Sequence, residues 1–159
     1  MGMVDDSREA GGLRRSNFKI IPDDDIDYLK TEIYAINADI SIFRFNTGYR
    51  TGYIDDIDRI NIMGDVFPDP YSTHPRDRMS VRAVLAHEYY GHRAFRGTIA
   101  QKGSWNDEFR ASYSAAKIAP GLSDEDRMYL MLDAIQRTKD SGVTIKFNSF
   151  MRRILYGND

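Results

Sequence analysis

The sequence predicts an α+β domain, in which a small twisted three-stranded sheet packs against several helices. Two observations support this class: apolar residues follow a strand-like pattern between positions 40 and 63, and they return to helical spacing on both sides. The chain has 159 residues, of which 42% are hydrophobic and 29% charged, as in an ordinary globular protein. We expect a flexible tail over residues 1–17, which lack apolar periodicity, and one domain over residues 18–159.

The first helix is expected directly after Pro22. Acidic residues follow this proline, where the positive end of a helix dipole favours negative charge. Apolar side chains then recur at the spacing of one helix face over about four turns, at Ile26, Leu29, Ile33 and Ile36.

Three short strands are expected next. Residues 40–45 are apolar and β-prone, residues 46–48 have the composition of a turn, and residues 49–54 can return beside the first strand. Arg59–Met63 alternates between polar and apolar residues and ends at Gly64, which indicates a third strand. The resulting sheet would be antiparallel or mixed.

The remainder of the chain is predicted to be helical, after a loop that its three prolines keep out of a helix interior. Helical spacing begins at Asp77 and continues into His87. Capping residues and apolar periodicity predict three later helices, over residues 104–119, 123–140 and 145–156.

The segment that carries the functional information is Ala86-His87-Glu88-Tyr89-Tyr90-Gly91-His92. The chain has three histidines, and two of them flank a glutamate here. In the pattern His-Glu-x-x-His, two histidines on one helix face bind zinc, and the glutamate acts as general base on the zinc-bound water. The chain has no cysteine, which excludes disulfides, thiolate metal sites and thiol catalysis.

The spacing in this chain is one residue longer than in that pattern. On a regular helix, a step of five residues leaves the two imidazoles about 140° apart, too far to share a metal ion. One extra residue absorbed as a π-bulge would restore a common face, and such bulges concentrate at functional sites. Gly91 lies where the distortion would be needed. We therefore predict a π-bulge between His87 and His92.

The motif resembles the His-Glu-x-x-x-His variant of the zincin metallopeptidases (gluzincin type) found in the dipeptidyl-peptidase III family. That family takes its third zinc ligand from a Glu-Glu-x-Arg-Ala motif, and Asp107-Glu108-Phe109-Arg110-Ala111 is similar. The resemblance implies that Zn²⁺ is held by His87, His92 and Glu108, with Glu88 as catalytic base. Asp107 is an alternative ligand, or an acceptor for a histidine N–H group.

A second resemblance, to the small intracellular ImmA/IrrE metallopeptidases, covers about residues 59–121. Arg76-Asp77-Arg78-Met79-Ser80 precedes the zinc motif as a similar Arg-x-Arg run does in that family, and Glu108-Phe109-Arg110-Ala111 is again matched. Membership would imply a minimal zincin-like fold, and the resemblance suggests a regulatory protease that cleaves a repressor.

On this hypothesis the protein is a zinc peptidase whose substrate is a peptide or protein. The strand Arg59–Met63 would border the cleft, and an extended peptide could pair with it. His74, Tyr113 and Tyr129 are weaker candidates for contact with the substrate or its oxyanion. Two alternatives remain open: a non-catalytic regulatory or interaction domain with this fold, and a toxin or effector peptidase.

Charge and hydropathy restrict the partners and the location. The 22 Lys and Arg residues against 24 Asp and Glu residues give a net charge of −2, so no basic nucleic-acid footprint is expected. No apolar run approaches the length of about 20 residues that crosses a bilayer, and the first 15 residues do not resemble a secretory signal. We therefore expect no nucleic-acid or membrane partner, and a cytoplasmic location.

Overall fold

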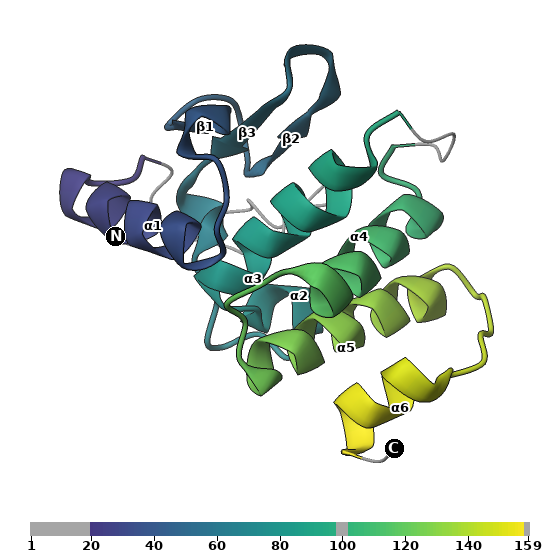
Figure 1. Cartoon of the computed structure of the whole chain (residues 1–159). Helices are drawn as coiled ribbons and strands as arrows, with labels where there is room; N and C mark the ends of the chain where they lie inside the picture. The colour runs from purple at the N-terminus through teal and green to yellow at the C-terminus, as the bar shows by residue number, and fades with distance from the viewer. Residues whose placement is uncertain (1–19, 98–101, 158–159) are drawn as a thin grey trace.

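The computed structural model describes residues 20–97 and 102–157. Over these residues the chain forms six α-helices and one mixed three-stranded sheet, which confirms the α+β class. Figure 1 shows the sheet at one end of the molecule, the segment that begins with α3 below it, and then α4, α5 and α6 in turn. The tail expected over residues 1–17 lies outside the described residues.

The sheet is built around its last strand. It consists of β1 (Phe43–Phe45), β2 (Gly52–Ile54) and β3 (Arg59–Ile62), in the spatial order β1-β3-β2. Strand β3 pairs with β1 in parallel and with β2 in antiparallel orientation. The prediction that Arg59–Met63 offers a free edge to a peptide is therefore wrong over the paired residues, because both sides of β3 already carry a partner. Ile60 and Ile62 have no exposed surface, which suits a central strand.

The second strand expected over residues 49–54 is present as β2, but it pairs with β3 and not with the first strand, because β3 lies between β1 and β2. The first strand is shorter than its composition suggests. Ile40–Ile42 forms the 3₁₀ turn η2, since the side chain of Asp39 caps this turn by accepting a hydrogen bond from the Ser41 N–H group.

Helix α1 (Asp23–Ala35) begins after Pro22, as expected, and buries Leu29 and Ile33 in the core. The helical segment expected from Asp77 is instead two helices, α2 (Pro75–Arg78) and α3 (Val81–Ala86). The break between them places Ser80 at the N-cap of α3, where its hydroxyl accepts from the Ala83 N–H group and donates to Asp126.

The three later helices are present, and the first two begin close to the predicted residues. Ser104 caps α4 (Trp105–Ile118), and Ser123 forms a capping box with Asp126 at the start of α5 (Asp124–Asp140). Helix α6 (Ser149–Tyr156) begins later than predicted, because Asn148 caps it. The remaining short helical turns are η3 (Asp55–Ile57), η4 (Gly64–Val66), the π-helical η5 (His87–His92) and η6 (Arg93–Phe95). Within the described residues, no helix combines the length and apolarity needed to cross a bilayer.

Candidate metal centre

The predicted π-bulge is present. Helix α3 continues into η5, a π-helical turn that covers His87–His92, the whole histidine motif. In a π-helix the hydrogen bonds join residues five apart, so residues at this spacing lie one turn above each other. The five-residue step that would separate the imidazoles on an α-helix therefore brings them together here.

Gly91 lies in this turn because helix α4 passes directly against it. A Cβ atom at residue 91 would lie 2.7 Å from the Cα atom of Ala111 and 2.8 Å from its carbonyl carbon. Both distances are far below a normal carbon contact, so only glycine fits at this crossing. Ala111 is itself small and fully buried. The close packing brings the first turn of α4, which carries Glu108, alongside η5.

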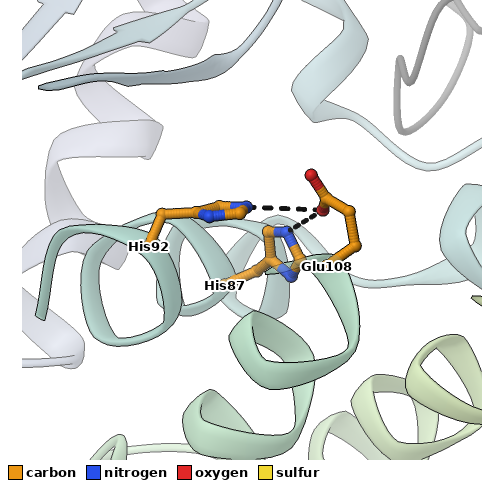
Figure 2. Close-up of side chains that lie close together, drawn as sticks. All are labelled: His87, His92 and Glu108. Atoms are coloured by element: carbon orange, nitrogen blue, oxygen red, sulfur yellow. Dashed lines mark hydrogen bonds and ion pairs between the residues drawn. The ribbon is translucent and has the colours of Figure 1, made fainter. Parts of the chain in front are cut away.

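Three side chains converge at this crossing. One carboxylate oxygen of Glu108, Oε1, lies 3.1 Å from Nε2 of His87 and 3.3 Å from Nε2 of His92. Figure 2 shows both imidazoles rising from one helical segment toward this oxygen. One possible ligand atom from each of the three residues lies within 4.8 Å of the others, so the group could hold a metal ion.

Two of the three distances between these possible ligand atoms can be compared with those around a tetrahedral zinc ion. Bonds of about 2.0–2.1 Å to a tetrahedral ion place neighbouring ligand atoms about 3.3 Å apart. The two distances to Glu108 Oε1 match this value. Two histidines with one carboxylate are also the ligand set of catalytic zinc sites that keep an open position.

A buried chain of hydrogen bonds holds the His87 ring. The Ser112 hydroxyl donates to Asp133 Oδ2 over 2.6 Å, and the hydroxyl oxygen Oγ of Ser112 lies 2.8 Å from Nδ1 of His87. Since the hydroxyl proton goes to the carboxylate, Ser112 accepts from His87, and the proton of a neutral ring resides on Nδ1. In that tautomer Nε2 has a lone pair available to a bound ion. Ser112 and Asp133 are fully buried.

The His92 ring has a carboxylate on each side. Its Nδ1 lies 3.6 Å from Asp107 Oδ1, and its Nε2 faces Glu108. Burial lowers the pKa of His92, but the interactions with Asp107 and Glu108 outweigh it and raise the pKa to about 10. Asp107 also accepts from the Gly103 N–H group and pairs with Arg110. It therefore contacts the outer nitrogen of His92, while Glu108 occupies the inner side.

The two glutamates of the centre have opposite electrostatic environments. Burial would raise the pKa of Glu108, yet its contacts with His87 and His92 hold the pKa well below its usual value. For Glu88 burial is the largest effect and raises the pKa, although the two histidines oppose it. Only 4% of Glu88 is exposed. A carboxylate with a raised pKa is suited to accept and return a proton.

Both glutamates line one cavity of about 410 Å³, which β2 borders. Residues Gly52 and Tyr53 of that strand form part of the wall, and β2 pairs with β3 along one side. The cavity wall also includes five cationic side chains, which are Arg50, Arg96, Lys102, Arg110 and Arg137.

The weaker sequence candidates do not line this cavity. His74 lies 3.6 Å from Asp140, and its Nδ1 accepts from the Arg76 N–H group. Tyr113 packs between Phe109 and Phe150. Tyr129 packs on the hydrophobic core.

The tyrosines of the motif contact neighbouring segments of the chain. Tyr89 stacks on Phe43, and the Tyr90 hydroxyl donates to the Ile36 carbonyl group. A different tyrosine, Tyr53, lines the cavity. Its hydroxyl donates to Asp58 Oδ1, and burial, together with that contact, raises its pKa to about 12.

Sequence reasoning did not identify Ser112, Asp133 or Arg137. Asp133 and Arg137 lie four residues apart on α5 and form a buried ion pair of 3.2 Å. A buried charged pair on a helix face otherwise lined with apolar residues is a signal for a polar site, since charges are rarely buried without a partner. That signal is visible only once the buried face of α5 is known.

Comparison of the chain with protein-family models, with curated proteins and with solved structures gives no match. The interpretation of the centre therefore depends on its own geometry and chemistry.

Proposed function

We propose that the protein is a zinc-dependent peptidase. The observation that carries the proposal is the π-helical turn, which directs His87 and His92 at one oxygen of Glu108 and leaves Glu88 in the same cavity. A structural role for zinc would not require a buried glutamate beside the ligands, nor a cavity at the site.

His87, His92 and Glu108 would hold the zinc ion, with His87 kept in its ligating tautomer by Ser112. Bound zinc would supply Lewis acidity and would lower the pKa of a bound water. Glu88 would accept the proton of the attacking water on its carboxylate and pass it to the leaving amine.

The substrate of this proposal is a peptide in extended form. Because β3 is central, the strand for peptide pairing is β2, which pairs on one side and lines the cavity with Gly52 and Tyr53. An extended peptide beside β2 would pass the catalytic glutamate with its main chain held by hydrogen bonds.

The test combines metal content with cleavage. Protein purified without chelator is expected to contain one zinc ion per chain by elemental analysis, and to cleave members of a random peptide library detected by mass spectrometry. Glu88→Gln should retain the zinc and lose cleavage by about a hundredfold or more, in line with the contribution of a general base. Zinc without cleavage in the wild type would indicate a non-catalytic domain, and full activity of Glu88→Gln would refute the mechanism.

A further inference from the structure

Arg137 presents an unused hydrogen-bond donor beside the candidate metal centre. Its Nε donates to Asp133 Oδ1, which fixes the orientation of the guanidinium group. Its Nη2 is buried, has no hydrogen-bond partner among the described residues, and lies 3.6 Å from Glu108 Oε1. Arg137 as a whole is only 9% exposed, and it lines the cavity.

A buried donor without a partner costs free energy, and a charged donor costs more. Asp133 occupies one side of the guanidinium, and Glu108 lies beyond hydrogen-bond distance from Nη2. Arg137 lines the cavity that also contains Glu88. An acceptor for Nη2 would therefore come from a bound ligand.

The charges of the cavity indicate the sign of that ligand. Its wall has five cationic side chains against four acidic ones, the latter being Asp55, Glu88, Asp107 and Glu108. A divalent ion would add two positive charges. Even with Asp133 counted behind Arg137, the site would keep a net charge of about +2. A neutral ligand would leave this excess uncompensated.

We infer that Arg137 is a substrate-binding residue that donates from Nη2 to a carboxylate of the substrate. This inference rests on the proposed peptidase function and names its substrate class: peptides that carry a carboxylate next to the bond cleaved. Two sources of that carboxylate have the same chemistry, the C-terminal carboxylate of a peptide and the side chain of an aspartate or glutamate. Arginine suits both, because its planar guanidinium binds Asp133 with one donor and offers another to the ligand.

The first experiment measures binding of three small probes by calorimetry, to zinc-loaded and to zinc-free protein. N-acetyl-alanine has a terminal carboxylate, the α-amide of N-acetyl-glutamate has only a side-chain carboxylate, and N-acetyl-alaninamide has neither. At least one carboxylate should bind tenfold to a hundredfold more tightly than the amide, which is the range for a hydrogen bond to a charged group. The probe that binds identifies the source.

Two variants separate recognition by Arg137 from general charge. Arg137→Lys keeps the charge, but one ammonium group cannot serve both Asp133 and the ligand, so the preference for carboxylate should fall about tenfold or more. Lys139→Gln removes an exposed cation from the same helix and should leave the preference unchanged. Carboxylate binding that is equally tight in Arg137→Lys, with zinc content intact, would overturn the inference.

A measurement on the wild-type protein covers the case in which Arg137→Lys does not fold. The guanidinium ¹⁵N and ¹H resonances of Arg137 should shift on titration with the binding probe, and unchanged resonances at saturation would overturn the inference. If the wild type binds no zinc, the proposed peptidase function fails. Binding of a carboxylate to the zinc-free protein through Arg137 would still establish the anion site, so the two failures are distinguishable.

Discussion

Substitution of Gly91 by alanine would test whether the crossing of η5 and α4 builds the metal centre. The added Cβ would lie 2.7 Å from the Cα atom of Ala111, whereas carbon atoms in contact prefer about 3.5–4.0 Å. Because the obstacle is main chain, rotation of a side chain cannot relieve it. The two segments would have to separate by about 1 Å.

That separation can be converted into expected effects. Overpacking of a core costs about 1–3 kcal/mol, and contact with a backbone puts Gly91→Ala near the upper end. Glu108 lies one helical turn from Ala111, so a shift of α4 by about 1 Å would displace the Glu108 carboxylate by a similar amount. That displacement is several times larger than the ~0.2 Å by which a zinc–ligand distance can vary. The zinc dissociation constant should therefore rise at least about tenfold.

Urea unfolding would measure the stability loss, and competition with a chromophoric chelator would measure zinc affinity. Gly52→Ala is the matched control, because nothing lies within 4 Å of its added Cβ. The control should change stability by less than about 0.5 kcal/mol. Wild-type stability and zinc affinity in Gly91→Ala would refute the close-approach argument.

Three further predictions concern the metal and its supporting residues. Ser112→Ala removes the acceptor for the His87 Nδ1–H group, so the zinc affinity measured by titration should fall about tenfold to a hundredfold. The control Ser114→Ala, on the same helix, should leave the zinc affinity unchanged. Zinc supplied at about 100 times its dissociation constant should stabilise the fold enough that its removal by a chelator lowers the melting temperature by about 5–10 °C. An unchanged melting temperature would contradict a zinc site in the folded state. Because the pKa of His92 in the metal-free protein is raised to about 10, this ring is protonated at neutral pH and must lose its proton to bind a metal. Zinc binding at pH 7 should therefore release about one proton or more, measured by calorimetry in buffers of different ionisation enthalpy, and affinity should rise with pH. The sign for stability is opposite: the raised pKa of His92 stabilises the metal-free fold fully below the unfolded value of about 6.5, and this contribution is lost as pH rises through about 10.

The features that the sequence predicts correctly are local ones. The capping residues Ser104 and Ser123 mark the starts of α4 and α5 because a cap satisfies backbone donors within a few residues. The π-helical turn follows from the five-residue step between His87 and His92, if both histidines are to serve one site. Glu108 required a resemblance to known motifs, since no rule of spacing selects it from the other acids.

The errors concern contacts between segments distant in the chain. Strand order in a sheet depends on which strand the core can bury on both sides, and only the packed structure shows that this is β3. The network of Ser112, Asp133 and Arg137 likewise forms because α5 lies against α4. Periodicity identifies which residues face a core, but it carries no information on which helices meet there. Local hydrogen bonding and helical spacing could be read from neighbouring residues, whereas the sheet order and the buried polar network arise from long-range packing of whole elements.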